Sequence, residues 1–171
     1  MGARSSVALY RGLMRPLDIL GVRVEMPTNT PIVLLKERDG ARHLPIWIGA
    51  AEATAIAYAQ QGVVPSRPLT HDLLVNVIAA LGDRLAAVRI ERIDDGIYHA
   101  ALVLGSGIEI DSRASDAIAL AIRAGADVVA PPELLDSAGI LLPEDTDDEV
   151  EKFKEFLDHV TPEDFESDPK Q

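Results

Sequence analysis

The sequence predicts an α+β fold with a mixed, largely antiparallel sheet of about six strands and three helices. Three observations carry this prediction. Two tight-turn sequences join strand-like runs into hairpins. Three helical segments stand among the strand-like runs without alternating strictly with them. The chain has 171 residues, 47% of them hydrophobic, which is enough for one domain with a buried core.

The predicted strands are short runs rich in apolar and β-branched residues, bounded by turn residues. Asp39-Gly40 lies between the second and third runs, and Asp94-Asp95-Gly96 lies between the fourth and fifth, so each pair should form a hairpin. The runs are 17–26, 31–38, 41–48, 86–93 and 97–104, and the short runs 108–111 and 127–130 could each add a strand.

Three helices are predicted between these strands. The first covers 50–61 and is alanine-rich on all sides, so it should be buried. The second follows Thr70 as its N-cap and stops at Gly82. The third covers about 115–125 and is apolar on nearly every side. The apolar face of the second helix comprises Leu73, Leu74, Val77, Ile78 and Leu81.

The negative charge is concentrated at the end of the chain. The net charge is −12, and residues 144–171 contribute −9 of it through 12 acidic and 3 basic side chains. We therefore divide the chain into an N-terminal extension at 1–13, a domain at 14–143 and an acidic tail at 144–171. The tail contains an amphipathic helix at 149–160, which either packs against the domain or binds a protein partner.

Composition excludes several classes of site. The chain has no cysteine, so disulfides, thiolate catalysis and zinc–sulfur sites are ruled out, and we expect a cytoplasmic protein. No apolar run reaches the roughly 18 residues that a membrane span needs. Aromatic residues make up only 4% of the chain, and no basic stripe is present, so any binding of nucleic acid should be weak. Arginine predominates among the basic residues of the domain, which suits phosphate recognition, although a GC-rich genome gives the same bias and is the interpretation we favour.

Three segments carry polar residues that a core does not require. They are 44–53 (LPIWIGAAEA), 67–73 (RPLTHDL) and 110–117 (IDSRASDA). In this order and spacing they resemble the bifunctional nuclease domain family, over about residues 17–143. Ala114 departs from the family pattern, which usually has proline there, but this change removes no chemical group. The resemblance implies a compact homodimer and the nuclease activity on RNA and DNA that is reported for some relatives; it supplies no mechanism residue by residue.

Hydrolysis of a phosphodiester requires an activated water, stabilisation of charge on the phosphoryl oxygens and an acid for the leaving group. The candidate residues lie where strands or loops lead into helices, and helix N-termini favour anions. The candidate catalytic residues are Glu52, His71, Asp72 and Asp116; the candidate phosphate ligands are Arg67, Ser112, Arg113 and Ser115; and the candidate ligands of Mg²⁺ or Mn²⁺ are Asp111 and Asp116.

Structural roles compete with these assignments. Glu52 could instead cap its helix, an acidic residue such as Asp72 is ordinary in a first helical turn, and Arg113 could form a structural ion pair with a nearby aspartate. We expect Trp47 in the core or in a dimer interface rather than as a platform for a base.

The central prediction is that the starts of the second and third helices, together with the turn at 47–52, face one solvent-accessible hollow. The favoured function is a nuclease acting on RNA and DNA with little sequence preference. The alternative is a non-enzymatic dimeric scaffold that binds an anionic ligand or a protein partner.

Overall fold

The structure, a computed structural model, describes residues 13–142. Predictions that fall on 1–12 and 143–171, including the helix at 149–160, lie outside the described residues. The strands are β1 (Arg15–Glu25), β2 (Thr30–Glu37), β3 (Arg42–Trp47), β4 (Leu85–Asp94), β5 (Ile97–Leu104), β6 (Glu109–Arg113), β7 (Asp127–Ala130) and β8 (Ile140–Leu141). The helices are α2 (Ala50–Gln60), α3 (Thr70–Ala80), α4 (Ala114–Ala124) and α5 (Pro132–Ala138).

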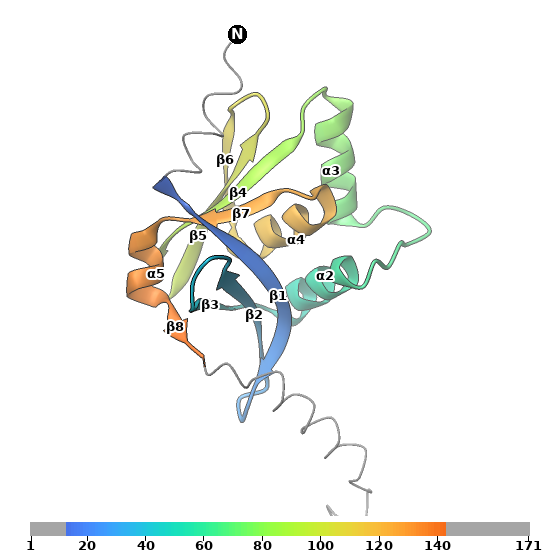
Figure 1. Ribbon diagram of the computed structural model, residues 1–171. Coiled ribbons are helices and arrows are strands. Elements are labelled where there is room, and N and C mark those ends of the chain that lie inside the picture. The colour runs from blue at the N-terminus through green and yellow to red at the C-terminus, as the bar shows by residue number, and fades with distance from the viewer. Residues whose placement is uncertain (1–12, 143–171) are drawn as a thin grey trace, which may run out of the picture. The chain divides into compact units, whose positions relative to one another are not determined.

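All eight strands form one sheet in the order β6-β5-β4-β7-β1-β2-β3-β8 (Figure 1). Every neighbouring pair is antiparallel except β4 and β7, which are parallel. The α+β class and the largely antiparallel sheet are therefore confirmed. The predicted counts were too low, because residues 13–142 contain eight strands and four helices rather than about six and three.

Both predicted hairpins are present. Leu35 lies opposite Leu44 in the first hairpin, and Ile90 lies opposite Ala100 in the second. In the second turn Asp95 and Gly96 have φ values of 51° and 78°, and the residues that flank them, Asp94 and Ile97, are paired. Two central residues with positive φ define the turn type that matches the twist of an antiparallel pair.

The two elements that the sequence did not predict are short. The seven residues of α5 follow Pro131, and Pro132 occupies the first helical turn, where a missing N–H costs nothing. Strand β8 has only two residues, both paired with β3. Helix α5 contacts both β3 and β4, although three strands separate them in the sheet, so the sheet curves strongly.

Helix α4 lies at the centre of the fold, against α2, α3 and strands β4 to β7. Its residues from Ala117 to Ala121 are all buried, as its apolar composition predicted. Helix α2 was wrongly predicted to be buried on all sides. Only Ala53 and Ile56 are buried there, because α2 packs with one face on α4 and β1 and its other face is exposed.

Helix α3 differs from its prediction at both its start and its apolar face. Its N-cap is Leu69 rather than Thr70, which is the first helical residue. Of the five residues predicted for its apolar face only Ile78 is buried, and the other four are exposed. No helix in the described part of the chain is long and apolar enough to cross a membrane.

Candidate functional site

Four predicted residues meet where three helices begin. We call Glu52, His71, Arg113 and Asp116 the site cluster. Glu52 lies in the first turn of α2, His71 in the first turn of α3 and Asp116 in the first turn of α4. Arg113 is the last residue of β6 and the N-cap of α4, with extended backbone angles of −65° and 142°. Because β6 runs directly into α4, its strand end and the helix start present both side chains to the same place.

The site cluster is a continuous chain of contacts. Arg113 donates from Nη1 to Glu52 Oε1 at 3.0 Å and from Nε to Asp116 Oδ2 at 2.7 Å. The second oxygen of Asp116 lies 3.0 Å from His71 Nε2. Residues up to 61 positions apart in sequence are thus joined by direct hydrogen bonds. The predicted convergence of the helix starts is confirmed for these four side chains.

The environment of the cluster keeps its charges in place and in reach of solvent. Burial raises the pKa of Asp116, but hydrogen bonds from Arg113 and His71 outweigh burial, and the pKa lies below its ordinary value. The bond to Asp116, followed by the bond to Glu52, raises the pKa of Arg113. The side chain of Arg113 is 65% exposed, against 29% for Asp116. A charged donor is therefore accessible to an anion, while its carboxylate partner is partly sheltered.

The cluster lines a hollow of about 710 Å³, which we call the site hollow. Its walls come from the starts of α2, α3 and α4 and from β6, and the apolar side chains Leu102 and Leu120 also line it. Asp111 and Ser112 line the same hollow. Ser112 donates from Oγ to the carbonyl oxygen of Arg113, whereas Asp111 is exposed and its carboxylate forms no hydrogen bond with another described residue. A small ligand of the size of a nucleotide fits within a volume of this order.

Three other predicted residues lie elsewhere. Asp72 accepts bonds from Arg123 Nε at 2.7 Å and from the Leu69 N–H at 2.9 Å, so it caps α3 and ties it to α4. The bond from Arg123, followed by the bond from Leu69, lowers the pKa of Asp72. Asp72 does not line the site hollow, so its predicted place with the other three catalytic candidates was wrong.

Arg67 and Ser115 are also outside the site hollow. Arg67 is exposed between α2 and α3 and forms no hydrogen bond with another described residue. Ser115 is buried in the first turn of α4 and lines an adjoining hollow. Of the four predicted phosphate ligands, Arg113 and Ser112 line the site hollow, Ser115 lines the adjoining hollow together with Arg113, and Arg67 lines neither.

The site cluster does not fit a divalent cation in this arrangement. Among residues 13–142 no group of three or more histidine, aspartate or glutamate side chains is placed to hold a metal ion. The guanidinium of Arg113 bonds both Glu52 and Asp116, and its positive charge disfavours a metal ion between the two carboxylates. Binding of Mg²⁺ or Mn²⁺ at these residues would require Arg113 to move.

A second hollow of about 360 Å³ adjoins the first and shares Glu52 and Arg113 with it. We call it the tryptophan hollow, because Trp47 lines it together with Ser115 and the turn between β4 and β5. Sequence reasoning missed it, since nothing local places the 96–98 segment beside α4. Trp47 is 52% exposed, so its predicted place in the core was wrong; its place in a dimer interface stays a prediction.

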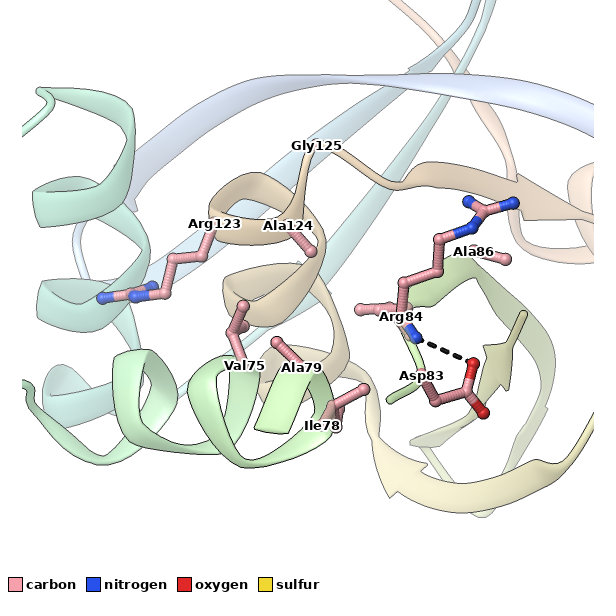
Figure 2. Close-up of a pocket in the computed structure, with 10 residues that line it drawn as sticks. Val75, Ile78, Ala79, Asp83, Arg84, Ala86, Arg123, Ala124 and Gly125 are labelled. Atoms are coloured by element: carbon pink, nitrogen blue, oxygen red, sulfur yellow. Dashed lines mark hydrogen bonds between the residues drawn. The ribbon is translucent and has the colours of Figure 1, made fainter. Parts of the chain in front are cut away.

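A third hollow, of about 290 Å³, lies on another part of the domain, between α3, the start of β4 and the end of α4 (Figure 2). Asp83 accepts a bond from the N–H of Arg84 at 2.7 Å and two further bonds from Ser106. The side chains of Arg84 and Arg123 extend in different directions rather than converging (Figure 2). With its one carboxylate already engaged, this hollow offers no acid–base group.

Comparisons with known proteins show the family of this chain. A family model described as the bifunctional nuclease domain matches residues 33–143, a range that contains the whole site cluster. Two uncharacterized proteins of Mycobacterium tuberculosis, one from each of two strains, are each 47% identical to this chain over 163 residues. Each alignment covers 90% of this chain and 99% of the relative. The chain belongs to the bifunctional nuclease domain family.

Proposed function

We propose that the protein is a nuclease that hydrolyses phosphodiester bonds of RNA and DNA with little sequence preference, and that the site cluster carries the reaction. One observation supports this most strongly. An exposed arginine lies between two carboxylates, one of which also binds a histidine, at the wall of an open hollow. These are the group types that phosphodiester hydrolysis needs, and they come from three separate helix starts.

Arg113 is the proposed phosphate ligand. Its guanidinium matches the geometry of phosphate oxygens, and it stands beside the free N–H groups at the start of α4. An incoming phosphate must compete with Glu52 and Asp116 for this side chain. With His71 neutral, the cluster carries one net negative charge, so binding should be weak. We expect a dissociation constant above about 1 µM at physiological salt.

Proton transfer is assigned to Glu52 and His71, which stand at the two ends of the chain of contacts. One activates the attacking water and the other protonates the leaving oxygen. Asp116 is a positioning residue, because its oxygens hold Arg113 and His71 in place. When Nε2 of His71 carries the proton, the bond to Asp116 leaves Nδ1 available to accept another proton.

Cation dependence belongs to the same proposal. Asp111 lines the site hollow, and no arginine or histidine of the described residues binds it. It is therefore the carboxylate through which Mg²⁺ or Mn²⁺ bound to a substrate phosphate would contact the protein. A cation in this position would add positive charge without displacing Arg113 from Glu52 and Asp116.

The test is cleavage of a fluorescent single-stranded RNA, and of the matching DNA, with and without EDTA. Glu52→Gln, His71→Ala and Asp116→Asn should each lower the rate by about 100-fold or more. Asp72→Asn is the matched control, since Asp72 is an acidic neighbour of His71 that does not line the site hollow. Equal activity in all four variants and the wild type would identify a contaminating nuclease and favour the non-enzymatic alternative.

We also propose that the protein forms a homodimer through α3. Five large apolar side chains at or near this helix are exposed. Exposed apolar patches of this kind usually mark an interface with another protein chain. They are Leu69, Leu73, Leu74, Val77 and Leu81. Sedimentation of wild type and of a Leu73→Glu variant tests the assembly: the wild type should sediment as a dimer and the variant as a monomer. A monomeric wild type at about 100 µM, well above the dissociation constants of stable dimers, would overturn it.

A non-enzymatic dimeric scaffold is the second candidate function, and the same apolar face of α3 is the observation that favours it. A protein partner for residues 144–171 stays a prediction, because all of those residues lie outside the described part of the chain.

A further inference from the structure

The tryptophan hollow is built differently from the site hollow. Its lining comes from the end of β3, the start of α2, the turn between β4 and β5 and the start of α4. Apolar side chains line one part of it, with Trp47, Ile97 and Tyr98 among them. Glu52 and Arg113 line the remainder and belong to the site hollow as well. One ligand can therefore lie in both hollows and contact Arg113 where they join.

Trp47 offers an aromatic surface in this hollow. The indole donates from Nε1 to Glu25 Oε2 at 2.7 Å, which restrains the orientation of the ring. About half of the side chain remains exposed, and Ile97, on the same hollow, is also exposed. A tryptophan that is held by its polar edge and open elsewhere suits a flat π-system, such as a nucleobase.

Ser115 supplies a polar group that has no partner. It is only 9% exposed, it lines the tryptophan hollow, and its hydroxyl forms no hydrogen bond with another described residue. No side-chain oxygen or nitrogen of the described residues is buried without a partner, so the small exposed part of Ser115 includes its hydroxyl, which a ligand in the hollow can reach. A hydroxyl both donates and accepts, so Ser115 can pair with a donor or an acceptor on the edge of any base. That property fits a site with little sequence preference.

We propose that the tryptophan hollow binds the base of an unpaired nucleotide while its phosphate contacts Arg113. This inference rests on the proposed function and names its substrate class: single-stranded nucleic acid. In a duplex, a base is stacked between neighbours and paired at its edge, so neither its face nor its edge is available to Trp47 and Ser115. The protein should therefore cleave single strands in preference to duplexes.

The chain has a single tryptophan, so its fluorescence reports directly on Trp47. The full-length protein is titrated with adenosine 5′-monophosphate, and separately with ribose 5-phosphate and inorganic phosphate. Adenosine 5′-monophosphate should quench the emission saturably, and the two ligands without a base should not. Equal responses to all three ligands would overturn the inference, because they would show binding of phosphate alone.

Two variants test the assigned contacts. Ser115→Ala should raise the dissociation constant for adenosine 5′-monophosphate several-fold, and Ser137→Ala in α5 is the matched control that should leave it unchanged. Trp47→Leu should reduce cleavage of a single-stranded RNA by about 5- to 100-fold, while the same RNA annealed to its complement, already a poor substrate, changes little. Unchanged values in both variants would overturn the proposal.

The design separates this inference from the proposed function. Cleavage of RNA that requires His71, without quenching by adenosine 5′-monophosphate, would overturn the nucleobase site and leave the nuclease in place. Quenching that requires Ser115, without any cleavage, would support the site and overturn the nuclease. An emission change that follows protein concentration alone, with no response to nucleotide, would place Trp47 in a dimer interface and overturn the inference.

Discussion

Two neighbouring residues at the start of α3, His71 and Asp72, belong to two different regions of the molecule. His71 contacts Asp116 in the first turn of α4, within the site cluster. Asp72 contacts Arg123 in the last turn of α4, and we call these two residues the clamp pair. Both regions join an aspartate to an arginine and both connect α3 with α4. They differ in how far the arginine is exposed to solvent and in which other groups it contacts.

The clamp pair is closed. Arg123 is 10% exposed and also donates from Nη1 to the carbonyl oxygen of Ala119, while Asp72 accepts a second bond from the backbone of Leu69. In the site cluster Arg113 is mostly exposed and contacts two carboxylates, although Asp116 and Asp72 are similarly exposed, at 29% and 26%, and hollows adjoin both regions. The comparison shows that access to solvent and competing partners, rather than residue type, separate a structural ion pair from a candidate site.

The largest expected effect comes from replacing Arg113 in the site cluster. Arg113→Gln should lower kcat/KM for single-stranded RNA by about 100- to 1000-fold, because it removes the donor proposed to stabilise charge on the phosphoryl group. The free energy of unfolding should change by less than about 1 kcal/mol, since exposed ion pairs contribute little. Rate measurements and urea unfolding on one preparation test both parts. A large loss of stability would mean that Arg113 is structural.

Replacing a residue of the clamp pair should lower the stability of the protein and leave its cleavage activity nearly unchanged. Asp72→Asn should lower the free energy of unfolding by about 1 to 3 kcal/mol, because it removes a charged partner from the sheltered Arg123 and weakens the helix cap. Cleavage measured well below the unfolding transition should stay within about twofold of wild type. Urea denaturation measures the free energy of unfolding. A double-mutant cycle that combines Asp72→Asn with Arg123→Gln shows whether the two side chains stabilise the protein together.

Acid should weaken both regions through their carboxylates. The pKa of Asp72 and the pKa of Asp116 both lie below the ordinary value in the folded protein, so folding favours the ionised forms. The resulting stability is fully present above the ordinary pKa of aspartate, about 4, and is lost as pH falls through the lowered values. Urea unfolding from pH 5 to pH 2.5 should show this decline. The slope should be shallower in Asp72→Asn than in the wild type.

The smallest effect is expected from a change to the backbone at the first residue of α4. Ala114→Pro should raise the free energy of unfolding by about 0.4 to 1 kcal/mol, because proline restricts the unfolded chain and fits the first helical position. Arg113 already has the extended angles that a residue before proline adopts. Thermal and urea unfolding test this gain, and a decrease would indicate that the ring displaces buried neighbours of Ala114.

Local patterns were sufficient to predict the hairpins and the long helices. The Asp-Gly sequence at 95–96 sets its turn through positive φ values at both residues, whereas neither residue of 39–40 has a positive φ, so there only the position of the turn was predicted. Strand β8 has no such signal, because two residues become a strand only through β3. Helix α2 was misjudged since alanine at six of its eleven positions, spread around the helix, gives no clear periodicity from which to identify the buried face.

Part of the candidate site could be predicted because its residues share a position type, the first turn of a helix or the residue before it. The sequence could not separate His71 from Asp72, since adjacent helical residues point about 100° apart and only the position of α4 decides which one faces the hollow. The tryptophan hollow depends on the turn between β4 and β5, which is about 50 residues from Trp47 in sequence and adjoins it only in the folded sheet.

Strand β7 joins two parts of the sheet that are separate in sequence. It pairs with β4 on one side and with β1 on the other, through three residue pairs each. During synthesis on the ribosome, the inner edges of β1 and β4 have no neighbour until Ala130 has been added. An unpaired edge invites association with other chains. The nascent protein is therefore exposed to aggregation for most of its translation, and the final residues of the domain remove that hazard.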